Sequence, residues 1–541
     1  MADMATLVEI MPAGASVVDR TRKKSSSRIG LMLFLLTLAG GLAYIGFHVS
    51  KDLDTVTITN VWPYLLLGLA LLIALGFEFV NGFHDTANAV ATVIYTHSLD
   101  PTVAVVWSGL CNLTGVLFSS GTVAFAIITL LPVELILQVS SGAGYSMIFA
   151  LLVAAIVWNL STWWFGLPAS SSHTMVGSII GVGVANQLMN VHGSGTSGVD
   201  WEQAIKVFKV LLISPVIGFG AAALLFLLSK WLIKYPALYE APKGNTPPPW
   251  PIRALLVLTC TGVSFAHGSN DGQKGMGLIM LILIGTVPTA YALNHAVTAN
   301  QVQDFIAASE QAGHILDQHV NKNGILGEDA RAEVTDYIRT KEIQPDTVLA
   351  LRELVEDLNH EVALYKEFKS VPANQQTNVR NDMYVASEAI RLMQKNHNPA
   401  FTKDETAALA SYKSKVDKAT KFIPDWVKVA VALALGLGTM VGWKRIVVTV
   451  GEKIGKEHLT YAQGATAELV AMATIFAADN FGLPVSTTHV LSSGVAGTMA
   501  ANKSGLQWST IKNIAMAWVF TLPAAALLSG CLFWLFRQMA G

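Results

Sequence analysis

Two short motifs each place an aspartate between long apolar segments. Asp85 lies in Asn81–Ala91 (NGFHDTANAVA), and Asp271 lies in His267–Leu278 (HGSNDGQKGMGL). An ionised carboxylate at the centre of a bilayer costs about 2.5–3.5 kcal/mol on insertion scales, so it usually faces a cavity, an ion or a partner. We therefore expect the two aspartates to meet a cation, a proton or a ligand. A polar clamp between helices, without a ligand, is the alternative.

Polar neighbours extend both acidic motifs. When the motifs are aligned, Asp85 matches Asp271 and Asn88 matches Lys274. Glu78 precedes Asp85 by two helical turns and therefore shares its helix face. Histidine is able to relay protons, although a structural hydrogen bond is the commoner role of a single one. The residues predicted to couple a cation or a proton to transport are Asp85, Asp271, Glu78 and His84.

Two further motifs combine a proline with a run of hydroxyl side chains. They are Gly166–Thr174 (GLPASSSHT) and Gly482–Val490 (GLPVSTTHV). Proline interrupts a helix, and serine or threonine then favours a new helix N-terminus, whose free N–H groups can bind an anion. Hydroxyls that only cap their own helices are the alternative. The residues predicted to bind substrate are Asp85, Asn88, Ser170, Ser171, Ser172, Asn270, Asp271, Lys274, Ser486, Thr487 and Thr488.

Acidic groups and an anion site are compatible if a cation lies between them, or if the anion carries a proton that it donates to a carboxylate. Either arrangement describes a cation-coupled symporter for a tetrahedral oxyanion. A permease for another oxyanion such as sulfate follows from the same chemistry. A channel or receptor with an external partner-binding segment is a third hypothesis, from a different class.

Composition restricts the class of protein. The 541 residues are 52% hydrophobic and only 13% charged, and 34 of the 73 charged residues lie between 301 and 424. This pattern excludes a soluble enzyme, a disordered chain and a collagen-like fibre, and favours a polytopic membrane protein. The net charge of −1 gives no support for nucleic-acid binding. The three cysteines have no CxxC partner, so we expect neither a disulfide framework nor a zinc site. We also expect no cofactor and no permanently bound metal.

Apolar segments and charged loops predict the domain organisation. The basic N-terminal tail and the basic linker favour the cytoplasmic side, and counting crossings from them places the long polar insert outside. The predicted segments are a cytoplasmic tail 1–28, an extra transmembrane helix 29–49, a first repeat 61–234, a cytoplasmic linker 235–253, the start of a second repeat 254–295, an external and mostly helical insert 296–424, and the remainder of the second repeat 425–537.

The motifs recur as pairs, which indicates an internal repeat. The acidic motifs are 186 residues apart and the hydroxyl motifs 316, and the difference of 130 is close to the size of the insert. Five crossings per half, an odd number, would invert the second half relative to the first, as in many transporters. We therefore predict an all-α polytopic membrane protein of eleven crossings. It has two inverted repeats of about five helices each, with broken or re-entrant helices, plus the extra first helix and the insert.

The four motifs, together with Gly451–Gly455 (GEKIG) and Ala515–Ala525 (AMAWVFTLPAA), resemble the PiT family of inorganic phosphate transporters, and especially its bacterial low-affinity branch. The resemblance covers nearly all of residues 61–537. It implies that the aspartates and hydroxyl turns form one phosphate and cation site at the repeat interface, worked by alternating access.

For that branch, the resemblance also implies symport of protons with a neutral complex of phosphate and a divalent metal (Mg, Ca, Zn or Mn). It implies a multi-pass protein of the bacterial inner membrane that is not an enzyme and that has the lipid bilayer as its surroundings. Assembly into a homo-oligomer is left open. Other members use sodium, so a sodium-coupled phosphate symporter is the alternative. Lys274 stands where the first repeat has Asn88, which makes sodium use less expected here.

Overall fold

The computed structural model describes residues 28–53, 61–85, 87–137, 141–189, 199–244, 246–321 and 329–540, and this part of the chain contains helices but no strand. The prediction for the tail 1–28 lies almost entirely outside these residues. The helices before the predicted linker are α2 (Arg28–Leu53), α3 (Trp62–Asp85), α4 (Ala87–Tyr95), α5 (Pro101–Leu117), α6 (Thr122–Ile128), α7 (Val133–Leu137), α8 (Gly142–Trp164), α9 (Ser171–Met189) and α10 (Trp201–Leu232).

The second half of the chain contains the insert. Its apolar helices are α11 (Trp250–Thr286), α12 (Pro288–Tyr291), α18 (Asp425–Thr439), α19 (Lys444–Glu452), α20 (Tyr461–Asn480), α21 (Thr487–Ala501) and α22 (Trp508–Ala540). The insert consists of α13 (Ala299–Gln318), α14 (Ala330–Thr340), α15 (Thr347–Tyr365), α16 (Ala373–Asn396) and α17 (Lys403–Thr420). Two short 3₁₀ helices, Pro236–Tyr239 and Phe368–Ser370, complete the set.

Helix boundaries differ from the predicted segments by a few residues. α11 begins at Trp250, inside the predicted linker 235–253, because Pro251 is compatible with the first turn of a helix. It ends at Thr286, before the predicted limit of 295. The predicted helix 29–49 is four residues longer at its C-terminal end, where α2 ends at Leu53.

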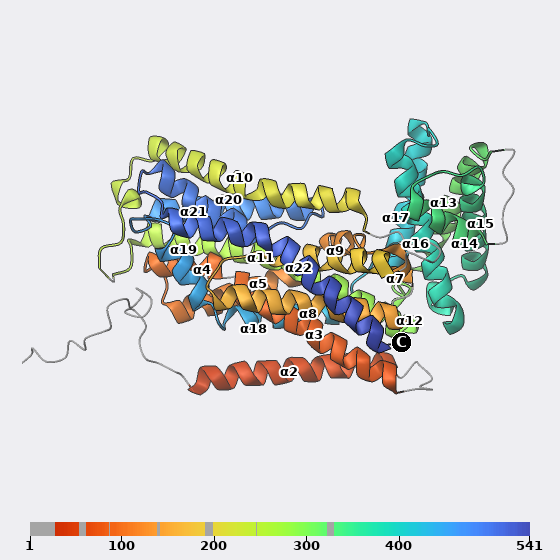
Figure 1. Ribbon diagram of the computed structural model, residues 1–541, viewed down its shortest axis with the longest axis horizontal. Helices are drawn as coiled ribbons and strands as arrows, with labels where there is room; N and C mark the ends of the chain where they lie inside the picture. The colour runs from red at the N-terminus through yellow and green to blue at the C-terminus, as the bar shows by residue number, and fades with distance from the viewer. Residues whose placement is uncertain are drawn as a thin grey trace, which may run out of the picture.

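The apolar helices form one elongated bundle, and the insert covers one end of it (Figure 1). The loop after α10 and the short α19 lie at the opposite end, while the C-terminus lies near the insert. α2 lies along one side of the bundle and packs mainly on α18. The basic linker and the polar insert are therefore at opposite ends of the molecule.

Six helices of the described chain are long and apolar enough to cross a membrane. Up to eight spans result if each of two sharply bent helix pairs counts as one, so the protein is a multi-pass membrane protein. Large apolar side chains are exposed along α2, α10 and α22, as expected for surfaces that face lipid. The predicted count of eleven also includes shorter helices such as α9, α20 and α21, and it stays a prediction.

The two halves exchange partners when they pack. α22 lies against α8 and α9 of the first half, and α10 lies against α20 and α21 of the second half. In the same way α3 packs on α18, and α11 packs on α5. Glycine permits the closest of these approaches, because a Cβ on Gly181 would overlap the carbonyl oxygen of Ala526, and one on Gly497 would overlap that of Phe219. Two inverted repeats would pack in this way, and their inversion stays a prediction.

The insert is a helical domain whose apolar core is built mainly from α13 to α17 and is joined by Val133 and Leu293 from outside the insert. It contacts the start of α10 through ion pairs. Lys341 Nζ lies 3.1 Å from Asp200 Oδ1, and Lys395 pairs with Glu202. Because Asp200 also accepts hydrogen bonds from the first N–H groups of α10, the insert is attached to a helix end rather than to a loose loop.

Candidate functional site

Both acidic motifs lie on apolar helices. Asp85 is the last residue of α3 and α4 begins at Ala87, and the two together form one candidate membrane span, Trp62–Tyr95. Asp271 lies within α11. Asn88, one of the predicted substrate ligands, lies at the start of α4, and its side chain is outside the described residues.

The hydroxyl motifs form the same turn in both halves. Gly166 and Gly482 have φ angles of +65° and +62°, a conformation that glycine adopts without strain. Ser170 Oγ then accepts a hydrogen bond from the backbone N–H of His173 at 3.2 Å. Ser486 Oγ accepts one from His489 at 3.1 Å. Both serines therefore cap α9 and α21, which is the alternative role of these hydroxyl groups.

Asp85 joins the two halves of the protein. Its Oδ2 accepts a hydrogen bond from Ser171 Oγ at 2.6 Å, and its Oδ1 accepts one from Thr488 Oγ1 at 2.7 Å. His84 Nδ1 lies 3.0 Å from the same Oδ1. One buried carboxylate thus meets the N-terminal turns of both α9 and α21.

Asp271 lies beside Asp85 and shares Ser171 with it. Ser171 Oγ is 3.3 Å from Asp271 Oδ2, and the Lys274 ammonium is 2.7 Å from that oxygen and 3.2 Å from Ser171. Lys274 is completely buried, so Asp271 supplies its counter-charge. Asp271 Oδ1 has no hydrogen-bond partner in the described part of the chain. This oxygen is therefore a buried acceptor that no described group uses.

The carboxylates also approach a histidine. Asp85, His267 and Asp271 each offer a ligand atom, and these atoms lie within 4.8 Å of one another, all in buried residues. His267 Nε2 is 3.4 Å from Asp271 Oδ2 but makes no hydrogen bond within the described chain. Two carboxylates and an imidazole are a donor set that suits a divalent cation.

Most of the remaining predicted residues have other hydrogen-bond partners. Ser172 donates to Val485 O at 2.8 Å, and Asn270 donates to Leu483 O at 3.2 Å, so both tie α9 and α11 to the second hydroxyl turn. Thr487 Oγ1 is buried without a partner among the described residues. Glu78 accepts a hydrogen bond from Gly275 N at 2.7 Å and therefore contacts α11, four residues beyond Asp271.

Several partners of the site residues were not predicted from the sequence. Thr162 Oγ1 lies 3.0 Å from His84 Nε2, and Asn112 Oδ1 lies 2.7 Å from His267 Nδ1, so these partners fix both imidazole rings. Asp479 accepts hydrogen bonds from Ser269 at 2.7 Å and Gln273 at 2.6 Å. The only available signal for Asn112 and Asp479 was a single polar residue within an apolar segment.

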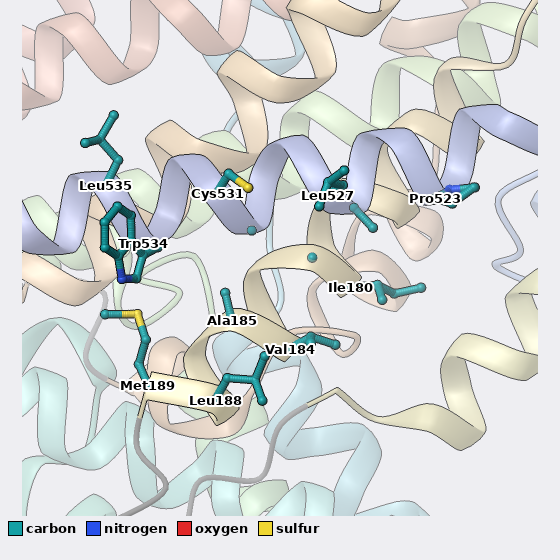
Figure 2. A pocket seen from close by; sticks show the side chains of 13 residues that line it. Ile180, Val184, Ala185, Leu188, Met189, Pro523, Leu527, Cys531, Trp534 and Leu535 are labelled. Carbon is teal, nitrogen blue, oxygen red and sulfur yellow. The ribbon is translucent and has the colours of Figure 1, made fainter.

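An apolar crevice in the described part of the chain does not belong to this site. It has a volume of about 770 Å³ and lies between α9 and α22, where Leu188, Leu527 and Trp534 are among its side chains (Figure 2). Its lining offers neither a charged group nor a row of hydroxyls, so it is unsuited to an anion. The polar chemistry is concentrated instead where α3, α9, α11 and α21 meet.

Comparison with known proteins points to one family. The family described as "Phosphate transporter family" matches residues 81–529. The low-affinity inorganic phosphate transporter PitA of Escherichia coli strain K12 is 42% identical over 493 residues, which cover 88% of this chain and 97% of the relative. PitB of the same strain is 39% identical, with coverages of 89% and 98%. A solved structure entitled "The sodium-dependent phosphate transporter" is 18% identical, with a TM-score of 0.48, and covers 88% of this chain and all of that one.

Proposed function

The chain belongs to the phosphate transporter family, and we propose that it imports inorganic phosphate by secondary active symport. The observation that carries this proposal is the position of Asp85. Its carboxylate accepts hydrogen bonds from Ser171 of the first half and Thr488 of the second. A group held by both halves is where relative movement of the halves would open or close a site, as alternating access requires.

The predicted substrate residues surround this carboxylate in a way that supports binding of a tetrahedral oxyanion. The N-terminal turns of α9 and α21 converge from opposite halves, and helix N-termini favour anions. In this proposal, ligands for phosphate come from Ser171, Thr488 and the unpartnered Thr487, while Ser170 and Ser486 shape the turns. Lys274 offers an ammonium group that is able to approach a phosphate oxygen.

A neutral complex of phosphate and a divalent cation fits the charges better than bare phosphate does. A phosphate dianion would be repelled by Asp85 and Asp271, which lie on either side of Ser171. In a metal–hydrogenphosphate complex, the cation would meet Asp85, His267 and Asp271, and the phosphate oxygens would meet the hydroxyl turns. The substrate would carry no net charge, so protons held by the buried acids would supply the charge that couples uptake to the membrane potential.

Sodium coupling is the alternative, and Lys274 argues against it. Its ammonium group is a fixed cation 2.7 Å from Asp271 Oδ2, at the position where the first repeat has Asn88. A sodium ion beside it would feel like-charge repulsion in a low-dielectric region. Uptake measured with and without sodium distinguishes the two modes directly.

Uptake of radiolabelled phosphate by purified protein in proteoliposomes tests the proposed function. We expect uptake that excess unlabelled phosphate competes away and that sulfate at the same concentration does not, because sulfate carries no exchangeable proton near neutral pH. Equal competition by sulfate would favour the general oxyanion permease. Empty liposomes are the control.

The proposed orientation places the insert outside and the basic loops inside, in the inner membrane of a bacterium. A single cysteine at Ser411, an exposed position of α17, would test it in a background in which the exposed Cys531 is changed to serine. We expect an impermeant thiol reagent to label Ser411→Cys in intact cells. Labelling only after the cells are opened would reverse the orientation.

A further inference from the structure

A polar cavity lies between the insert and the membrane helices. It has a volume of about 510 Å³ and is bounded by α17 and by the bend of 75° between α5 and α6. We call it the lysine pocket, because Lys413, Lys418 and Lys421 line it. No residue of the proposed transport site contributes to its wall.

Positive charge exceeds negative charge in the lysine pocket. Its one carboxylate, that of Asp417, lies 2.5 Å from Lys413 Nζ and 2.9 Å from Lys421 Nζ. Lys418 also lines the pocket, is exposed, and has no carboxylate partner in the described chain. Burial lowers the pKa of Lys421, because desolvation disfavours the charged ammonium group even beside Asp417. A bound anion would offset this desolvation.

Hydroxyl groups on the opposite wall add hydrogen-bond donors. Ser120 Oγ and Thr122 Oγ1 lie 2.9 Å apart at the bend between α5 and α6. Lys428 Nζ donates to Ser119 O at 3.2 Å, so a further ammonium group lies at the same bend. Ammonium and hydroxyl groups that face one another can both donate hydrogen bonds to the oxygens of a phosphate group.

The pocket wall is in direct contact with the helix that carries the transport site. Val123 N, next to Thr122, donates to Gln273 Oε1 at 2.9 Å, and Gln273 lies between Asp271 and Lys274 on α11. Thr122 also contacts Asp479 O at 3.4 Å, and Asp479 holds Gln273 through its carboxylate. The lysine pocket is therefore separated from α11 only by the first residues of α6.

We propose that the lysine pocket binds a phosphate-type oxyanion, either free inorganic phosphate or the headgroup of an anionic phospholipid. Free phosphate held there would be concentrated beside the transport site, a role that rests on the proposed function. Binding in the pocket does not rest on it, and is measured separately.

Protection of a cysteine measures binding directly in the full-length protein. Ser414, which lines the pocket, is changed to cysteine in the Cys531→Ser background, and its reaction with an anionic thiosulfonate reagent is followed at increasing inorganic phosphate. We expect phosphate to slow the reaction and chloride at equal ionic strength not to. The double change Lys413→Gln and Lys418→Gln should raise the half-protecting concentration by about threefold or more.

Lys403→Gln with Lys415→Gln is the matched control, because both lysines lie on α17 outside the pocket wall and the charge change is the same. The Lys413→Gln and Lys418→Gln protein is called the pocket variant. Free phosphate is supported as the ligand if phosphate protects the cysteine in phosphatidylcholine nanodiscs and only the pocket variant loses this protection. Co-purified phosphatidylglycerol that falls only in the pocket variant, without protection by phosphate, supports the lipid. If the pocket and control variants behave alike in both measurements, the proposal is wrong, whether or not the protein transports phosphate.

Discussion

Replacing Asp85 by asparagine is expected to lower the initial rate of phosphate uptake at least about 100-fold, which corresponds to about 3 kcal/mol of lost charge interaction. The amide keeps the shape of the carboxylate and one acceptor oxygen for Ser171 or Thr488, so the fold should survive. It removes the negative charge that the proposed cation or proton requires. Uptake by the purified variant in proteoliposomes measures the effect.

Asp271→Asn should abolish uptake as well, but with a larger cost in stability. It leaves the ammonium of the fully buried Lys274 without its counter-charge, and such breakage costs about 3–5 kcal/mol. Combining it with Lys274→Met should restore the melting temperature without restoring uptake. Asp404→Asn, at an exposed acid of α17, serves as the control. Wild-type uptake by either buried variant, at matched protein amounts, would contradict the assigned role.

Uptake should require a divalent cation, collapse when a protonophore is added, and be unaffected by replacing sodium with choline. The physical reason is the charge of the site, where two carboxylates repel bare phosphate and His267 completes a donor set for a divalent cation. Measurement is made in proteoliposomes, with pH, Na⁺ and Mg²⁺ varied one at a time after treatment with a chelator. Because only one of these conditions changes at a time, the effects of protons, sodium and magnesium on uptake are measured separately.

Strict sodium dependence in metal-free liposomes would overturn that prediction and favour a sodium site near Asp85 and Asp271. Lys274→Asn sharpens the comparison, because it gives the second repeat the residue of the first. If the ammonium group stands in for a cation, this variant should lose uptake under sodium-free conditions. Any stimulation by sodium that appears in the variant alone would identify Lys274 as the residue that excludes sodium.

Paired motifs made much of the fold and site predictable. The alternation of apolar segments and the position of the charged insert follow from the chemistry of a bilayer, and the helical architecture is confirmed. Asp85, Asp271, Ser171 and Thr488 come together as the shared motifs indicate. Lys274 could also be placed beside Asp271, since residues three apart share a helix face.

Other features could not be derived from a single sequence. Three adjacent hydroxyls look alike in the sequence, yet Ser170 caps α9, Ser171 contacts Asp85, and Ser172 binds the other half through Val485. The role of each of the three serines depends on how the first turn of α9 is rotated about the helix axis. Asn112 and Asp479 reach the site from helices distant in the chain, and only the tertiary fold brings them there.

The exchange of partners between α10 and α22 has a consequence for the origin of the protein. Each of these closing helices packs on two helices of the opposite half, so a single half lacks the surface that would cover its own last helix. If both halves descend from one gene and the predicted inversion holds, the ancestral product would have covered its last helix by pairing with an identical chain inserted in the opposite orientation. Gene fusion would then have fixed one orientation for each half and freed Asn88 and Lys274 to diverge.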